Sequence, residues 1–98
     1  MHFEWDAEKA KRNRRKHSVD FEFAKLIFGG PVLEGPNHET DEGEERIIAI
    51  EAVGETELVV VHTWRREVRR LISARRANEK ERKASRHAFY EPDRSGSD

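Results

Sequence analysis

The 98-residue chain contains no cysteine, one methionine and three prolines. Without cysteine it can form no disulfide and no thiolate metal site, and it has no thiol nucleophile. Aromatic residues make up 8% of the sequence, and no apolar run approaches the roughly 18 residues that a membrane helix needs. Residues 1–9 are polar and acidic, without the core of a signal peptide. We therefore expect one cytoplasmic domain that has no contact with a membrane.

Charged residues are abundant, at 40% of the chain against 35% hydrophobic residues, so the core should be small and a partner could cover part of the surface. The net charge of −1 conceals a segregation. Residues 1–33 carry seven basic and five acidic groups, residues 34–57 carry one and nine, and residues 58–98 carry eleven and six. Such a chain can bind a polyanion through one region and repel it from another, although a solvated charged surface is the simpler interpretation.

The N-terminal segment predicts a short strand followed by a basic helix. Residues 3–5 alternate between apolar and polar side chains, and Asp6 can cap the helix that follows to about Lys16 or His17. Six of the eight residues 9–16 are basic, so the exposed face of this helix is strongly cationic. It suits a general electrostatic funnel, or a solvated face, better than it suits recognition of particular bases.

A second helix is predicted over residues 21–28, with Asp20 as its cap and Gly29-Gly30-Pro31 as its end. Four apolar side chains lie on one side of it and are expected to face the core, namely Phe23, Ala24, Ile27 and Phe28. Phe21 and Leu26 lie off that stripe and would only widen it.

The middle of the chain predicts an antiparallel meander. Residues 46–53, 57–64 and 68–75 are strand-like and are separated by short turns, and a further strand can start at Val32-Leu33. Residues 34–45 have the composition of an acidic loop. A helix from about Arg76 to Tyr90 follows, which makes the fold class α+β. We expect a single domain over residues 1–91 and a flexible tail over residues 92–98.

The third predicted strand is dense in arginine. Alternation places Val68, Arg70, Ile72 and Ala74 on one face and Arg69, Leu71, Ser73 and Arg75 on the other. A strand of so small a domain cannot easily hide this many guanidinium groups. They are either a costly decoration or a surface that binds phosphate, which the planar fork of arginine suits.

The last predicted helix contains one carboxylate among small side chains. Ala77, Glu81, Ala84 and Ala88 recur at helical spacing and should face the body of the protein. A half-buried carboxylate needs a partner, and the strand arginines can supply it. Glu81 could therefore be a catalytic group or only a salt-bridge partner.

These residue types suffice for metal-free cleavage of RNA, in which a base and an acid move protons and cations stabilise the phosphorane. Lys16, His17 and Glu81 are the candidates for proton transfer, with His62 as an alternative base. His17 could instead simply end its helix, and His62 is more typical of a packed strand residue. Trp5 and Trp64 suit core packing better than RNA stacking. The five histidines have no metal-ligand spacing, so we predict neither a metal nor a cofactor.

Several motifs together resemble the BrnT family of toxins from type II toxin–antitoxin systems. The similarity extends over residues 3–91 and includes FEWD at its start and ISAR at residues 72–75. Its other elements are N-x-x-K-H at Asn13, Lys16 and His17, T-x-R at Thr63 and Arg65, and E-R at Glu81 and Arg82. Where the family usually has glycine after the histidine, this chain has Ser18, which would be strained if the backbone there requires a positive φ.

The resemblance implies a RelE-like fold, in which an antiparallel sheet packs against the two N-terminal helices. It implies a ribonuclease that arrests growth, a homodimer within a larger complex, and a BrnA-like antitoxin through which alone DNA is contacted. By position, it suggests a catalytic surface of Lys16, His17, Arg65, Arg70, Arg75 and Glu81. RNA-binding residues are expected at Lys9, Arg12, Arg66, Arg69 and Arg76. The alternative is a degenerate toxin, a non-catalytic nucleic-acid-binding or co-repressor partner of an antitoxin.

Overall fold

The computed structural model of the protein describes residues 2–37 and 44–90, so the predicted tail at residues 92–98 lies outside the described residues. The described residues form five strands, three α-helices and one 3₁₀ helix. In order they are β1 (His2–Glu4), α1 (Ala7–His17), α2 (Phe21–Ala24), the 3₁₀ helix η1 (Lys25–Gly29), β2 (Leu33–Asn37), β3 (Arg46–Val53), β4 (Thr56–Arg65), β5 (Val68–Arg76) and α3 (Glu79–Tyr90).

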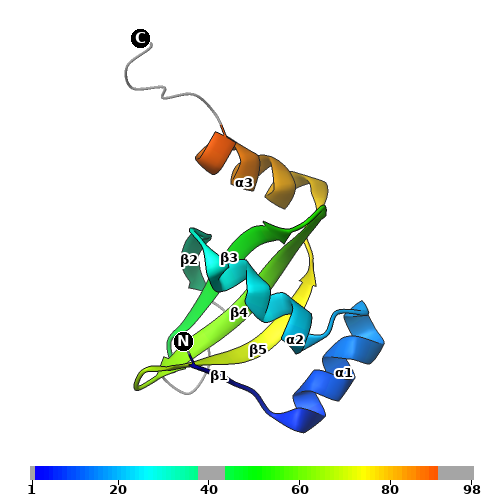
Figure 1. Ribbon diagram of the computed structural model, residues 1–98, viewed down its shortest axis with the longest axis vertical. Coiled ribbons are helices and arrows are strands. Elements are labelled where there is room, and N and C mark those ends of the chain that lie inside the picture. Colours follow the sequence, from blue (N-terminus) through cyan, green and yellow to red (C-terminus); the bar gives the residue numbers. More distant parts are fainter. Residues whose placement is uncertain (1, 38–43, 91–98) are drawn as a thin grey trace.

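The five strands form one sheet in the order β1-β5-β4-β3-β2 (Figure 1). The predicted antiparallel meander of β3, β4 and β5 is confirmed. A purely antiparallel sheet is wrong, because β1 pairs parallel with β5 and places Glu4 opposite Arg70. This pairing joins segments more than sixty residues apart, so the local pattern of a three-residue strand cannot reveal its direction.

Strand β2 is longer than predicted. Residues 34–37, which have the composition of a loop, continue the strand and pair with β3 from Leu33 opposite Ile50 to Asn37 opposite Arg46. Pro36 is tolerated because β2 is an edge strand, where one side of the backbone needs no ladder partner. The prediction of a loop is therefore wrong for residues 34–37, and its part over residues 38–43 lies outside the described residues.

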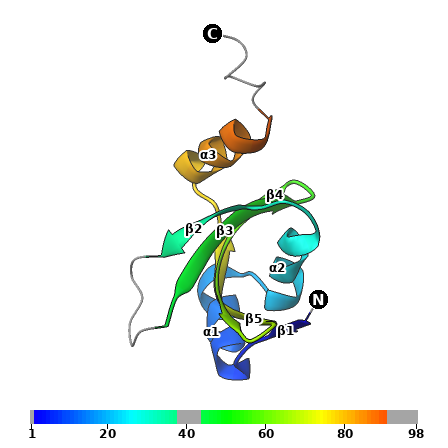
Figure 2. The ribbon, with the colours of Figure 1, turned by 90° about the vertical axis from the view of Figure 1, so that its left-hand side faces the viewer.

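The helices α2 and η1 cross one face of the sheet and form the core with it (Figures 1 and 2). Phe21 is 2% exposed and Phe23 is 39% exposed, which reverses the predicted order of burial. The reason is the tighter 3₁₀ winding from Lys25 onward, with about three residues per turn. At that period Phe21, Ala24 and Ile27 share the buried side, and Phe23 turns toward solvent.

Helix α1 is held against the free edge of β5 mainly by one side chain, Asn13. Its amide nitrogen donates to the carbonyls of Ala74 at 2.8 Å and Val19 at 3.1 Å, and its oxygen accepts from Ala74 N at 3.0 Å. Asn13 is the one residue of α1 that is buried. The amide thus replaces the neighbouring strand that β5 lacks beyond β1.

Both ends of α1 are capped. The Asp6 carboxylate accepts from Glu8 N and Lys9 N, as predicted for an N-cap. These two backbone hydrogen bonds lower the pKa of Asp6. At the other end Ser18 has φ 59° and ψ 33°, the left-handed conformation that glycine adopts more easily. The expected strain at Ser18 is therefore present, at a cost of about 1 kcal/mol.

Strand β5 contains an irregularity that changes which side chains share a face. Leu71 lies opposite His62 and Ser73 lies opposite Val61, so Ile72 is an extra residue in β5. Such a β-bulge shifts the alternation of side chains by one residue. Residues before Ile72 therefore point to one face at even numbers, and residues after it point to that face at odd numbers.

Among the described residues, no helix is long and apolar enough to cross a membrane.

Candidate active site

Three arginines share the face of the sheet that is turned away from α2. Val59, Thr63 and Arg65 of β4 point to this face. In β5, Arg70 lies opposite Thr63 and Arg75 lies opposite Val59, so both arginines point to it as well. The predicted separation of Arg70 from Arg75 is wrong, because the bulge at Ile72 brings them to the same side. We call this surface the arginine face, defined by Arg65, Arg70 and Arg75 with Thr63 and Ser73 between them.

Each arginine of this face contacts a carboxylate from a different part of the chain. Arg70 Nη1 donates to Glu4 Oε2 of β1 at 2.8 Å, and Arg65 Nη2 donates to Glu44 Oε2 at 3.2 Å. Arg75 binds Glu81 of α3 through two parallel hydrogen bonds of 2.8 and 2.7 Å. A carboxylate fixes the plane of a guanidinium and leaves other N–H groups to bind phosphate.

Glu81 is the most constrained of the three carboxylates. Besides binding Arg75, its Oε1 accepts from Asn78 N at 2.8 Å, while Asn78 Oδ1 accepts from Glu81 N at 2.8 Å. This reciprocal pair is a capping box, and it starts α3 at Glu79 rather than near Arg76 as predicted. The hydrogen bonds from Arg75 are the main cause of a lowered pKa for Glu81. The side chain therefore stays ionised and is suited to orienting Arg75.

The predicted small-residue stripe of α3 is only partly correct. Ala77 is buried, and the Glu81 side chain is 23% exposed, so the carboxylate is half-buried as expected. Ala84 is exposed instead, and Ser85 is fully buried. The helix begins at Glu79, so Ala77 precedes it and is not part of a helical stripe. The side chain of Ala88 lies outside the described residues.

Arg65 is exposed, and a carboxylate of the chain contacts its guanidinium. Its side chain is 54% exposed and lies beside Glu44, which is also 4.0 Å from Arg46 Nε. Thr63 Oγ1 donates to the carbonyl of Glu45 and ties this segment to the sheet. The Glu44 carboxylate thus binds one N–H group of Arg65 and competes there with any other anion.

A groove of about 360 Å³ lies where α1 meets the edge of β5. It brings together four basic residues predicted for the site and two residues at the bulge, and the lining residues include Lys9, Arg12, Lys16, His17, Ile72 and Ser73. Ser73 also belongs to the arginine face, in the stretch of β5 between Arg70 and Arg75. The groove and the arginine face are therefore neighbours, and Ser73 joins them.

Arg69 is buried rather than displayed. It is 9% exposed, and its guanidinium carbon lies 3.8 Å from the centroid of the Phe28 ring and 4.4 Å from that of Trp64. Burial lowers its pKa, and the Glu34 carboxylate partly offsets that shift. A guanidinium held between two rings supports them, so burial argues against the predicted direct contact of Arg69 with RNA.

His62 lies in the same buried cluster and is fully inaccessible. Its Nε2 is 3.2 Å from Glu34 Oε2, and since a carboxylate only accepts, Nε2 carries the proton. Burial and the positive charge of Arg69 lower the pKa of His62, against the opposing effect of Glu34. A base must reach its substrate, so this burial makes His62 unsuitable as the alternative catalytic base.

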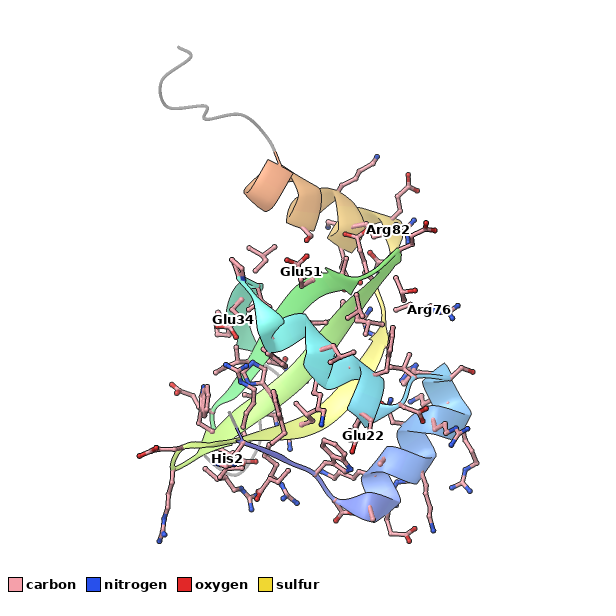
Figure 3. The ribbon with its side chains drawn as sticks, viewed as in Figure 1. His2, Glu22, Glu34, Glu51, Arg76 and Arg82 are labelled. Atoms are coloured by element: carbon pink, nitrogen blue, oxygen red, sulfur yellow. The ribbon has the colours of Figure 1, made fainter. Side chains whose placement is uncertain are left out.

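The two remaining predicted RNA contacts lie at opposite ends of the sheet. Arg66 is exposed in the turn between β4 and β5, with φ 59°. Arg76 is exposed at the other end of β5, near Arg82 and the start of α3 (Figure 3). Arg82 Nη1 donates to the carbonyl of Ala77 at 2.9 Å, which fixes its position there. The structure therefore does not gather Arg76 with the groove of α1.

Four residues of the site were not assigned roles from the sequence. Glu4 and Glu44 contact the arginine face from distant positions, and nothing in the local pattern predicts either contact. The role of Asn13 is likewise a tertiary one. Asn78 is different, because the spacing of Asn78 and Glu81 fits a capping box and could have marked the start of α3. Within the described ranges, no group of three or more metal-ligating side chains converges.

The sheet, the arginine face and the adjoining basic groove define a small α+β protein with a concentrated cationic surface. A family model described as "Ribonuclease toxin, BrnT, of type II toxin-antitoxin system" matches residues 5–81, and the chain belongs to this family. Membership indicates a ribonuclease toxin and implies an antitoxin partner. Comparison with curated proteins finds no similar sequence.

Proposed function

We propose that the protein is an endoribonuclease toxin that cleaves RNA without a metal ion. The observation that supports this most strongly is the arginine face, where Arg65, Arg70 and Arg75 are each oriented by a carboxylate. Guanidinium groups stay charged at any physiological pH and bind phosphate oxygens in pairs. They can therefore stabilise the extra charge of a phosphorane as it forms.

The proposed reaction is an internal transfer within RNA. The 2′-hydroxyl oxygen attacks the adjacent phosphorus and loses its proton to a base, the bond to the 5′-oxygen breaks, and an acid protonates that leaving oxygen. The products are a 2′,3′-cyclic phosphate and a 5′-hydroxyl. His17 and Lys16 line the groove that reaches Ser73, so we assign the proton transfers to them. Glu81, which is held ionised by Arg75, is assigned to positioning.

The basic residues of α1 are proposed to guide the RNA. Lys9 and Arg12 line the same groove as Lys16 and His17, on a helix that Asn13 fixes against β5. Contacts between these side chains and the phosphates of RNA add affinity but do not distinguish one base from another. The remaining partners follow the family: we propose a BrnA-like antitoxin and a toxin homodimer within their complex, with DNA contacted only through the antitoxin.

The test is cleavage of a single-stranded RNA by purified protein in the presence of EDTA. We expect cyclic-phosphate products, no cleavage when the attacking 2′-hydroxyl is replaced by hydrogen, and severe losses in Arg65→Ala and Arg75→Ala. Arg15→Ala, which removes an exposed arginine of α1 outside the groove, is the matched control and should retain activity. Activity that needs added metal, or full toxicity in both site variants, would contradict the proposal.

A non-catalytic role is the second candidate, and one observation favours it. The two oxygens of Glu81 are occupied by Arg75 and Asn78, so this carboxylate cannot easily exchange a proton. A protein of this kind would bind RNA, leave it intact and not slow growth, while still assembling with its antitoxin. Intact RNA in the assay above, together with measurable binding, would favour this alternative.

A further inference from the structure

Trp64, near the end of β4, is the most exposed aromatic residue among the described side chains. It is 44% exposed, whereas Phe23 is 39% exposed and Trp5 is half-buried. The Arg69 guanidinium covers one side of the indole ring at 4.4 Å. The accessible part of Trp64 therefore lies away from Arg69. Trp64 is thus a flat surface that is supported from behind.

The support behind Trp64 is rigid. Arg69 lies between Trp64 and Phe28, and the His62 ring makes edge contacts with Phe28 at 5.0 Å and with Trp64 at 6.3 Å. Phe28 belongs to the hydrophobic core. A ring held in this way loses little further freedom when another ring stacks on it, which favours binding. The guanidinium also places a positive charge beneath the stack.

Two arginines follow Trp64 at the tip of the β4–β5 hairpin, which projects at one corner of the sheet (Figure 1). Arg65 follows Trp64 directly and points to the opposite face of the strand. Arg66 comes next, exposed, at the first position of a two-residue turn. Its φ of 59° is one that glycine would adopt without strain, so the chain places an arginine where the backbone favours glycine.

We propose that the hairpin tip is a binding site for one unpaired nucleotide of RNA. The base stacks on the exposed side of Trp64, and the neighbouring phosphates bind Arg66 and Arg65. Stacking on an aromatic ring requires a base whose face is accessible, which single strands offer and duplexes do not. The substrate is therefore single-stranded RNA, bound both at this tip and along the arginine face. This inference rests on the proposed ribonuclease function and names its substrate class.

The test uses the intrinsic fluorescence of Trp64. The chain has two tryptophans, so Trp5→Phe leaves Trp64 as the reporter, and Phe can keep the edge contact that Trp5 makes with Phe21 at 5.7 Å. A short 2′-O-methyl oligouridylate serves as the probe, because it cannot be cleaved by 2′-hydroxyl attack. We expect it to quench Trp64 emission, whereas an RNA duplex and inorganic polyphosphate at equal charge do not.

Affinity measurements separate stacking from a structural role of Trp64. Trp64→Leu should weaken binding of the oligouridylate by roughly 5- to 100-fold, and Trp64→Phe, which keeps an aromatic face, should retain most of the affinity. Phe23→Leu is the matched control, since Phe23 is a comparably exposed aromatic on α2, and it should bind as the unaltered protein does.

Three results would overturn the inference while leaving the ribonuclease function intact. They are unchanged Trp64 emission with the oligouridylate bound, equal quenching by polyphosphate, and a response of Trp64 to the antitoxin but not to RNA. Equal affinities of Trp64→Leu and the unaltered protein would overturn it too. If the unaltered protein neither binds nor cleaves single-stranded RNA, the proposed function itself is wrong.

Discussion

Glu81 holds Arg75 through both carboxylate oxygens and also closes the first turn of α3 through Asn78. One side chain thus links the arginine face to the start of a helix. Glu81 orients the Arg75 guanidinium and helps to cap α3, and a different substitution can test each of these two effects.

Glu81→Gln should impair RNA cleavage by roughly ten-fold or more, because glutamine has one oxygen acceptor and no charge with which to hold Arg75. Asn78→Ala removes the helix cap but leaves the ion pair. It should lower the free energy of unfolding by about 1 kcal/mol and retain the cleavage rate of the folded protein. Rate assays and denaturant unfolding of both variants check this. Equal losses of activity would mean that Glu81 acts only through α3.

Asn13→Ala should lower the free energy of unfolding by roughly 2–3 kcal/mol, measured by denaturant titration. The change leaves the buried N–H and C=O of Ala74, and the carbonyl of Val19, without this partner. Lys11→Ala, an exposed residue of the same helix, is the control and should change stability little. A loss below about 0.5 kcal/mol for Asn13→Ala would show that water or repacking replaces the amide.

Glu44→Gln should raise the affinity for single-stranded RNA by a few-fold, because it removes an anion that competes for Arg65. Glu67→Gln, in the exposed turn beside Arg65, removes the same charge and controls for long-range electrostatics. The gain from Glu44→Gln should vanish in an Arg65→Ala background. Binding titrations at fixed ionic strength measure both effects, and equal gains from the two glutamates would contradict a specific competition.

Stability should fall as the pH drops below the ordinary histidine pKa of 6.5. The pKa of folded His62 is lower than that value, so between the two the unfolded chain binds a proton that the folded protein does not. The free energy of unfolding therefore rises with pH through this window. Above it, the contribution of His62 to stability no longer changes with pH. The slope is at most about 1.4 kcal/mol per pH unit.

His62→Gln should remove this slope between pH 6.5 and the folded pKa, since glutamine can still donate to Glu34 but does not titrate. The groups that face His62 are Glu34 from β2 and Arg69 from β5. The pKa values of Asp6 and Glu81 are also lowered, but from below 5, so they act in a separate, more acidic range. His17→Gln is the control, and an unchanged slope in His62→Gln would exclude His62 as its source.

Much of the fold follows from local patterns in the sequence. Three strands, their turns and the cap at Asp6 were predictable, because each depends on neighbours in the chain. The direction of β1 was not, because its partner lies in β5. Residues 34–37 were missed for a related reason, since glycine and proline look like a loop unless pairing with β3 is known.

The site was predictable in its residue types more than in its arrangement. The family resemblance points to Lys16 and His17, and the groove brings both together with Ser73. Alternation alone separated Arg75 from Arg70, because a regular period cannot reveal the extra residue at Ile72. The carboxylates that orient Arg65 and Arg70 come from distant segments, which no local pattern can indicate.

Because Ile72 is an extra residue, the side chains of β5 alternate in one phase before it and in the opposite phase after it. Substitutions before it should alternate in effect with one parity, and those after it with the other, so a mutational scan of the strand should show a phase jump at this residue. Deleting Ile72 would leave an uninterrupted ladder in which Arg75 and Arg76 keep their faces, whereas pairing Ile72 without a bulge would exchange them. The bulge therefore absorbs one residue and keeps Arg75 on the face of Glu81, so a chain that lacks this residue can still share the site.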